Sequence, residues 1–214
     1  MKLYTYYRSS AAYRVRIALS LKGIVYESLP RHLTRDGGEH RQPEYLAANP
    51  QGLIPLLEDG DATIAQSLAI IEYLEETHPE PPLLPRSPVE RAQVRSFALA
   101  IACDIHPLNN LRVLEYLRAP LGHDTAAVNE WYRHWIACGF RGLETQASRM
   151  GADRRHLVGA TVTLADVCLV PQMYNARRLN CDLEPYPTLR QISAYLESLP
   201  AFARAAPEAQ PDAV

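Results

Sequence analysis

A change of pattern around the proline-rich segment 78–88 constrains the fold of this 214-residue chain more than any other feature. Before it, short stretches of strand and helix type alternate; after it, the apolar periodicity is helical almost throughout. Because proline cannot continue a helix, the segment indicates a linker. The sequence predicts an N-terminal domain over residues 1–80, a linker over 81–88 and a second domain over 89–214.

The first half predicts the order strand, helix, strand, followed by two strands and a helix. Asp59-Gly60 is a hairpin turn signal between its last two strands. This order is typical of a thioredoxin-like fold, and the second half predicts an all-α domain. The expected strands are 3–7, 25–29, 53–57 and 62–65, with helices ending before Gly23 and over 43–48, 68–77, 89–118, 124–149, 164–179 and 188–203, and an irregular tail over 205–214.

Arg8, Ser9 and Ser10 lie where the first strand meets the first helix. Small hydroxyl residues are favoured at a helix N-cap. The first turn of such a helix has free backbone N–H groups and the positive end of the helix dipole. We therefore expect an anion site here, suited to a thiolate or a carboxylate, with Arg8 adding a fixed charge that suits a carboxylate.

Composition excludes several classes of function. A net charge of −2 gives no reason to expect nucleic acid or an anionic membrane as a partner. No apolar run approaches the roughly 18–20 residues that span a bilayer, and no secretory signal is visible, so we expect a cytoplasmic protein. Seven histidines show no metal-ligand spacing, so no metal site is expected. The four cysteines contain no Cys-x-x-Cys, and we interpret them as reduced thiols in a cytosolic core: Cys103, Cys138, Cys168 and Cys181.

The stretch from Arg8 to Leu19, Arg-Ser-Ser-x-x-Tyr-Arg-Val-Arg-Ile-Ala-Leu, resembles the signature of zeta-class glutathione transferases, the maleylacetoacetate isomerase family. The resemblance covers essentially the whole chain, from Met1 to the Gln-Pro-Asp near the end. Four further motifs fit the same family: Asn49-Pro-Gln-Gly-x-x-Pro55, Gln66-Ser-Leu-Ala-Ile-Ile-Glu-Tyr-Leu-Glu75, Cys103-Asp-Ile-His-Pro-Leu-Asn-Asn110 and Ala165-Asp…Val-Pro-Gln172.

The resemblance implies glutathione as cofactor and a glutathione thiolate held by the hydroxyl of Ser9, with Ser10 as the second choice. A hydroxyl donor and a helix N-terminus both lower the pKa of a thiol. The family usually has a cysteine after these serines, but this chain has Ala11. Any activity that depends on that cysteine is not expected, whereas chemistry that uses the thiol of glutathione survives the loss.

Two further positions follow from the resemblance. It implies that Pro55 is cis and that Ile54 pairs with the cysteinyl unit of glutathione like an added strand. It also implies that Gln66 and Ser67 hold the γ-glutamyl group, with Ser67 capping the helix that follows. The simpler alternatives are that Pro55 is an ordinary edge-strand proline and that Ser67 only caps its helix.

The second substrate would bind to the helical half. His106 and Asn110 are candidates for contacting glutathione, and Asn109 and Arg112 for contacting the substrate, although a structural histidine or a solvated arginine is the simpler alternative. Neighbouring helix residues point in different directions, so only one of Arg177 and Arg178 would face a cleft. The family places a substrate-binding arginine here, and Arg178 aligns best. Arg14 and Arg16 are expected to be structural or surface charges.

The resemblance thus implies a glutathione-dependent cis–trans isomerase. A thiolate would add to the cis double bond of a dianionic maleyl keto diacid, the single bond would rotate, and the thiolate would leave. Arg8 and one of Arg177 and Arg178 would hold the two carboxylates. Asn109-Asn110-x-Arg112, together with Ala11, favours maleylpyruvate over maleylacetoacetate.

Two alternatives belong to other functional classes. A conjugating transferase or dehalogenase would use the same thiolate but consume glutathione. A non-catalytic binding module with this fold would bind protein partners. For the isomerase, the resemblance also implies a two-fold homodimer.

Overall fold

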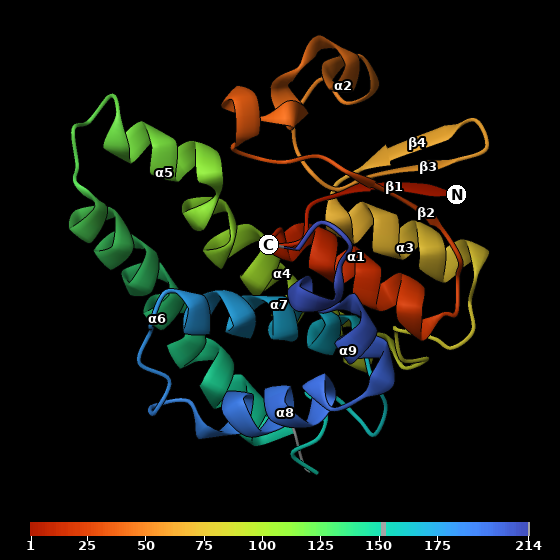
Figure 1. Cartoon of the computed structure of the whole chain (residues 1–214). Helices are drawn as coiled ribbons and strands as arrows, with labels where there is room; N and C mark the ends of the chain where they lie inside the picture. The colour runs from red at the N-terminus through yellow and green to blue at the C-terminus, as the bar shows by residue number, and fades with distance from the viewer. Residues whose placement is uncertain (151–152, 214) are drawn as a thin grey trace. The chain divides into compact units, whose positions relative to one another are not determined.

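The computed structural model describes residues 1–150 and 153–213, and the chain forms two compact units (Figure 1). Unit 1 consists of Met1–Pro82 together with Ser198–Val214, and unit 2 of Leu83–Glu197. The three-part division expected from the sequence stays a prediction. The structure adds that the segment beginning at Ser198 belongs to the same compact unit as the N-terminal residues.

Unit 1 contains a mixed four-stranded sheet in the order β2-β1-β3-β4. The parallel strands β1 (Lys2–Thr5) and β2 (Glu27–Pro30) are joined through the helix α1 (Ser10–Leu21), while β3 (Leu56–Asp59) runs antiparallel to β1 and to β4 (Ala62–Ala65). A parallel pair needs such a crossover, whereas β3 and β4 need only the two-residue turn Gly60-Asp61, which follows the pair Asp59–Ala62 and lies one residue later than the expected Asp59-Gly60. The sheet confirms the predicted thioredoxin-like fold.

Helices cover both faces of this sheet (Figure 1). The helices α1 and α3 (Ser67–Thr77) pack together on one face, and α2 (Pro43–Ala48) lies on the other. The ring of Tyr4 meets Tyr45 of α2 edge-on, with 5.5 Å between the ring centroids. Because side chains alternate along a strand, Leu3 then points towards α1 and α3, where it is fully buried.

The predicted bounds of the helix 43–48 and of the strand 62–65 are confirmed, but the third strand was placed too early. It was expected over 53–57 and begins at Leu56. Pro55 has no backbone N–H to donate to a neighbouring strand, and the Ile54–Pro55 peptide is cis. The ladder therefore starts only after the proline.

The C-terminal segment of unit 1 contains the helix α9 (Pro200–Ala205), which packs against α1. The short 3₁₀ turn η5 (Pro207–Ala209) follows and contacts α9. The single helix expected over 188–203 is thus two helices, because a proline begins the second at Pro200. The tail is less irregular than predicted, and Val214 lies outside the described residues.

Unit 2 is helical. The helix expected over 89–118 is divided into α4 (Pro88–Leu99), a π-helical turn η3 (Ala100–Ile105), a 3₁₀ turn η4 (Pro107–Asn109) and α5 (Leu111–Arg118). Pro107 cannot donate within a helix and so separates the two α-helices. The long helix α6 (Thr125–Met150) packs against η3 and against α8 (Pro187–Glu197).

The helix α7 (Leu164–Arg178) is the centre of unit 2, because it packs against α4 and α8 and is buried at every position from Leu164 to Met173. A capping box stands at its start: Asp166 accepts from the Thr163 backbone N–H at 2.8 Å and from the Thr163 hydroxyl at 3.0 Å. Asp166 is fully buried, and this burial raises its pKa to about 6.

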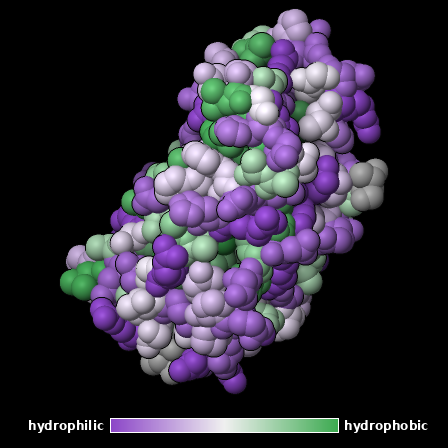
Figure 2. Space-filling view, turned by 90° about the vertical axis from the view of Figure 1, so that its left-hand side faces the viewer, coloured by the Kyte–Doolittle hydropathy of each residue, from purple (hydrophilic) through white to green (hydrophobic). Residues whose placement is uncertain are grey.

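The face of the molecule in Figure 2 carries mainly hydrophilic side chains, with hydrophobic residues in small groups. Within the part of the chain that the structure describes, no helix is long and apolar enough to cross a membrane. The four cysteines are free thiols, but the expectation that they lie in a core holds only for Cys168. Cys103 is exposed, and Cys138 and Cys181 are partly exposed.

Candidate active site

One row of the sheet in unit 1 brings three predicted segments together. Tyr4 pairs with Leu56, and Leu56 pairs with Ala65. The chain leaves this row towards Ser9 on β1, enters it from Ile54 on β3, and leaves it towards Ser67 on β4. Because β3 is antiparallel to both neighbours, all three segments emerge at the same edge of the sheet.

Ser9 is the N-cap of α1, as predicted from its place at the junction of strand and helix. Its hydroxyl oxygen accepts from the Ala12 backbone N–H at 3.2 Å. That contact uses a lone pair and leaves the hydroxyl proton available for an anion. Ser10 occupies the first turn and is buried, with 5% of its surface exposed. The junction thus has the features of an anion site: a hydroxyl donor at the start of a helix.

Arg8 is exposed, and its guanidinium lies against two tyrosines. One terminal nitrogen donates to the Tyr6 hydroxyl at 3.2 Å. The guanidinium carbon lies 5.2 Å from the centroid of the Tyr7 ring and 5.9 Å from that of Tyr6, within the range of a cation–π contact. The charge of Arg8 therefore has a defined place shortly after the first strand ends.

The loop that carries Arg8 and Ser9 is held from two directions. The fully buried Arg16 donates to the carbonyls of Tyr6 and Tyr7, at 3.2 and 2.9 Å. From the C-terminal segment, the carboxylate of Asp212 accepts the Tyr7 backbone N–H at 3.0 Å. Of the two alternatives for Arg16, the structure favours a structural role over a surface charge.

Ile54 lies beyond the last pairs of both ladders, and the peptide to Pro55 is cis, as the resemblance implied. Its side chain is buried in a cluster that also contains Ala12 of α1 and Tyr6. The position at which an added strand would pair is therefore packed directly beside the start of α1.

The junction of β4 and α3 differs from the prediction in one respect. Ser67 does not cap α3: the N-cap is Gln66, at φ 73° and ψ 120°, and Ser67 is the first helical residue. The Ser67 hydroxyl is buried and instead accepts from the guanidinium of Arg14 at 3.3 Å. The Gln66 amide donates to the Gln51 side chain at 2.8 Å. A backbone with positive φ at Gln66 shifts the helix start by one residue.

The predicted polar residues of unit 2 follow the π-helical turn. The amide of Asn109 is buried and donates to the Tyr132 carbonyl at 3.2 Å, so it ties η4 to α6. Asn110 caps α5 by accepting the Arg112 backbone N–H at 3.2 Å, and Arg112 is exposed. His106 is partly buried where η3 meets η4. π-Helical turns occur frequently at functional sites.

The two adjacent arginines at the end of α7 differ in their surroundings. Arg177 makes a bidentate ion pair with Glu197 of α8 and also donates to Ser193 at 3.2 Å. Arg178 faces Tyr132 instead: burial raises the pKa of Tyr132, and the charge and hydrogen bond of Arg178 lower it. Both arginines are exposed, but the charge of Arg177 is already neutralised by a carboxylate.

Sequence reasoning missed three residues around the loop that carries Arg8 and Ser9: Tyr6, His32 and Asp212 contribute to it only through contacts that the fold creates. A signal existed for Asp212, because the family resemblance found in the sequence extends to the Gln-Pro-Asp near the end. Among the described residues, no group of three or more histidine, cysteine and acidic side chains is placed to hold a metal ion.

Comparison with known proteins identifies the family. A family model for the glutathione S-transferase N-terminal domain matches residues 3–82. A probable maleylacetoacetate isomerase of Vibrio cholerae is 57% identical over 211 residues, which cover 99% of this chain and 97% of that protein.

Two solved structures match over 100% of both chains. A holo maleyl pyruvate isomerase, described as a bacterial glutathione S-transferase of the zeta class, has a TM-score of 0.97 at 48% identity. A maleylacetoacetate isomerase of Methylobacterium extorquens AM1, with bound malonate and glutathione, has a TM-score of 0.95 at 43% identity. The chain belongs to the maleylacetoacetate and maleylpyruvate isomerase family, within the zeta class of the glutathione transferases.

Proposed function

We propose that this chain is a glutathione-dependent cis–trans isomerase that converts a maleyl keto diacid, with maleylpyruvate favoured, to its fumaryl isomer. The observation that carries the proposal is the sheet row Tyr4–Leu56–Ala65, because it brings the Ser9, Ile54 and Ser67 segments to one edge. The structural relatives named above are isomerases of the same fold along their whole length.

The residues at this edge fit glutathione chemically. The peptide groups of Ile54 lie beyond both ladders and suit the backbone of a tripeptide. The start of α3, with Gln66 and Ser67, offers polar donors for the γ-glutamyl group. His106 and Asn110 are proposed as further contacts to the cofactor. The relative from M. extorquens was solved with glutathione bound.

Glutathione, when bound, supplies a thiolate whose reversible addition to the cis double bond leaves a single bond that can rotate. Ser9 stabilises that thiolate by donating its hydroxyl proton while its oxygen caps α1. The N-terminal N–H groups of α1 stabilise the same negative charge, and Ser10 is the second candidate donor. Both effects favour the ionised thiol at neutral pH.

A dianionic substrate needs two cationic partners. We assign Arg8 to one carboxylate and Arg178 to the other, since Arg177 is already paired with Glu197. Arg112 remains a proposed contact, because it is exposed. Asn109 is a weaker candidate, because its amide is used in holding η4 against α6. The relative from M. extorquens was solved with malonate, a dicarboxylate, which supports this assignment.

Maleylacetoacetate is the second candidate substrate. The relative with 57% identity is a probable maleylacetoacetate isomerase, whereas the structure with a TM-score of 0.97 is a maleylpyruvate isomerase. We further propose a two-fold homodimer located in the cytoplasm, as the family resemblance implies. Sedimentation analysis of the purified chain tests the dimer.

The test of function follows ultraviolet absorbance with each maleyl substrate, with and without a catalytic amount of glutathione. The proposal expects conversion that requires glutathione and leaves total thiol unchanged, and it expects Ser9→Ala and Arg8→Ala to lose most of the turnover. Consumption of thiol would indicate a transferase instead. Full turnover in both variants would contradict the assigned site.

A further inference from the structure

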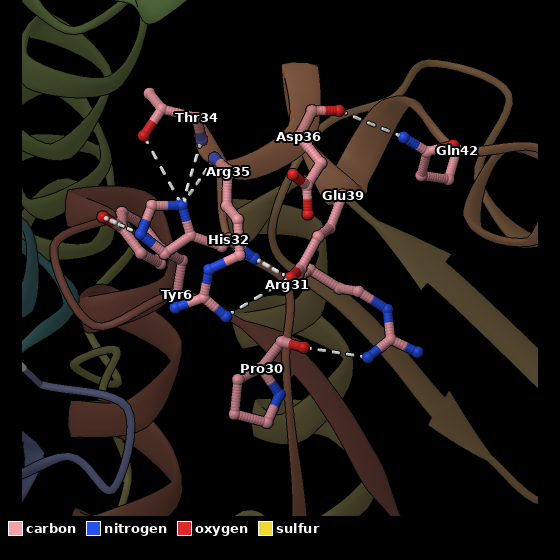
Figure 3. A network of polar contacts seen from close by, with 9 residues as sticks. All are labelled: Tyr6, Pro30, Arg31, His32, Thr34, Arg35, Asp36, Glu39 and Gln42. Atoms are coloured by element: carbon pink, nitrogen blue, oxygen red, sulfur yellow. Dashed lines mark hydrogen bonds and ion pairs between the residues drawn. The ribbon is translucent and has the colours of Figure 1, made fainter.

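A network of polar contacts links the loop after β2 to Tyr6, which lies just before Arg8 and Ser9 in the chain (Figure 3). Its centre is His32, which follows β2 and precedes the 3₁₀ turn η1 (Arg35–Gly37). The Nδ1 atom of His32 accepts from the backbone N–H groups of Arg35 and Thr34, at 2.9 and 3.2 Å. A neutral imidazole nitrogen that accepts two N–H groups carries no proton, so this pattern assigns the ring proton to Nε2.

The protonated Nε2 of His32 faces the Tyr6 hydroxyl at 3.4 Å, and the two rings meet edge-on with centroids 4.9 Å apart. The Tyr6 oxygen therefore accepts from His32 on one side and from Arg8, at 3.2 Å, on the other. Burial raises the pKa of Tyr6, with Arg8 acting in the opposite direction, so Tyr6 stays a neutral hydroxyl at neutral pH.

This arrangement restrains a side chain that otherwise has many rotamers. Arg8 is exposed, yet the oriented Tyr6 oxygen and the faces of Tyr6 and Tyr7 hold its guanidinium in place. A side chain that is held before binding loses less freedom when a ligand arrives. In contrast, the backbone of the same loop is held by Arg16 and Asp212, whose contacts do not involve the Tyr6 hydroxyl.

We propose that Tyr6 and His32 are positioning residues that orient the guanidinium of Arg8 towards a carboxylate of the diacid substrate. The proposal rests on the proposed function, in which Arg8 binds that carboxylate. The proposal predicts different effects on the two ligands: loss of the Tyr6 hydroxyl weakens binding of the diacid and leaves glutathione binding unchanged.

The test compares Tyr6→Phe with a matched control, Tyr4→Phe, in the full chain. Tyr4 lies on the strand that leads into the same loop, and its hydroxyl donates at 3.0 Å to Glu58, a residue with no assigned role. We expect Tyr6→Phe to lower kcat/KM for the maleyl diacid about tenfold, as for the loss of one hydrogen bond to a charged group. The KM for glutathione should stay within about twofold of wild type, and Tyr4→Phe should change neither value.

The inhibition constants of two competitive inhibitors distinguish a positioning role of Tyr6 from a purely structural one. The inhibition constant of malonate should rise about tenfold in Tyr6→Phe, while that of S-methylglutathione stays unchanged. His32→Leu, which keeps the Tyr6 hydroxyl but removes its donor, should shift the malonate constant in the same direction by about threefold. Equal weakening of both inhibitors would overturn the proposal, because it would indicate a general loosening of the loop.

A double-variant cycle identifies the residue through which Tyr6 acts. If Tyr6 works through Arg8, Tyr6→Phe has no further effect once Arg8→Ala is present, and the double variant matches Arg8→Ala alone. If the fold losses of the two single variants multiply in the double variant, the proposal is overturned. Failure of the wild-type protein to isomerise either substrate would instead contradict the proposed function, and malonate binding by calorimetry would still test the role of Tyr6.

Discussion

The guanidinium of Arg177 donates from both terminal nitrogens to the carboxylate of Glu197, at 2.9–3.0 Å. This pair distinguishes two arginines that the sequence places side by side. A guanidinium whose fork is already filled by a carboxylate has little to offer a second one. For this reason our proposal assigns the substrate carboxylate to Arg178.

We expect Arg178→Ala to raise the KM for the maleyl diacid by about 10- to 100-fold, because it removes a charge-assisted contact. Arg177→Ala should leave that KM within about twofold and lower the free energy of unfolding by about 1 kcal/mol, the value of a well-formed surface ion pair. Steady-state kinetics and urea unfolding of the two variants check this assignment. A large change in KM for Arg177→Ala alone would reverse it.

Two glycines of α6 provide a matched pair for the contact between α6 and the π-helical turn. A Cβ added at Gly139 would lie 2.2 Å from the Cδ1 atom of Ile105, whereas one added at Gly142 would meet nothing within 4 Å. Gly139→Ala should cost about 1–3 kcal/mol of unfolding free energy through overpacking. Gly142→Ala should add about 0.5–1 kcal/mol, because alanine favours a helix.

Denaturant unfolding of both variants, and of Gly139→Ala in an Ile105→Ala background, tests the contact. Ile105→Ala removes both atoms that lie nearest to the new methyl group, Cγ1 and Cδ1, so in that background Gly139→Ala should cost less unfolding free energy than it does in the wild type. If Gly139→Ala and Gly142→Ala changed the free energy of unfolding equally, the close approach of η3 to α6 would be contradicted.

Lys22 follows the C-terminal end of α1, at the opposite end of that helix from Ser9. Its ammonium, with a fully buried side chain, donates to Glu75 and to the His78 carbonyl at 2.8 Å each and to the Pro81 carbonyl at 3.0 Å. All three of its donors are thereby used. Lys22→Met should lower the free energy of unfolding by about 2–4 kcal/mol, because it leaves a carboxylate and two carbonyls without this donor.

Lys2 is the control for this prediction. It lies 3.8 Å from Glu58, and half of its side chain is exposed, so Lys2→Met should cost less than about 0.5 kcal/mol. Chemical unfolding of the two variants gives the comparison. Similar losses in both would show that the Lys22 contacts contribute no more than an exposed pair.

The stability of the protein should depend on the ionisation of Asp166. Its pKa is about 6 in the folded protein and 3.8 for the unperturbed group, so between these values the folded state binds a proton that the unfolded state does not. Stability from this group is therefore greatest at low pH and falls as pH rises from about 4 to about 6. At about 1.4 kcal/mol per pH unit, the loss reaches about 3 kcal/mol.

The difference in unfolding free energy between wild type and Asp166→Asn isolates this effect, because other groups titrate in both proteins. The advantage of the wild type should decrease across pH 4–6 by up to about 3 kcal/mol. A difference that stays constant, or that grows with pH, would contradict the raised pKa.

Much of this fold could be predicted because its signals are local. The turn signal at Asp59-Gly60 and the proline-rich segment after Thr77 are read from a few adjacent residues, and so is the capping of α1 by Ser9. Arg8 and Ser9 are neighbours in the chain, so the sequence alone identifies the strand–helix junction that carries them.

The remainder depends on contacts between distant residues. The hydrogen bond between Tyr6 and His32 joins residues 26 positions apart, and no periodicity predicts it. The start of α3 was predicted one residue too late. Nothing in the sequence indicates that Gln66, a non-glycine residue, adopts a positive φ. The choice between Arg177 and Arg178 depends on Glu197, which only the packing of α7 on α8 brings near.

Asp212 and Tyr7 are 205 positions apart, and their contact means that unit 1 is assembled from both sides of unit 2 in the sequence. A ribosome synthesises the residues of the sheet first, yet their loop lacks the Asp212 carboxylate, and Arg16 lacks the Ala205 carbonyl, until every residue of unit 2 has been made. Folding during synthesis generally proceeds from the N-terminus. In this chain the unit that begins first is completed last, so the loop that carries Ser9 takes its final form only after the helical unit has been synthesised.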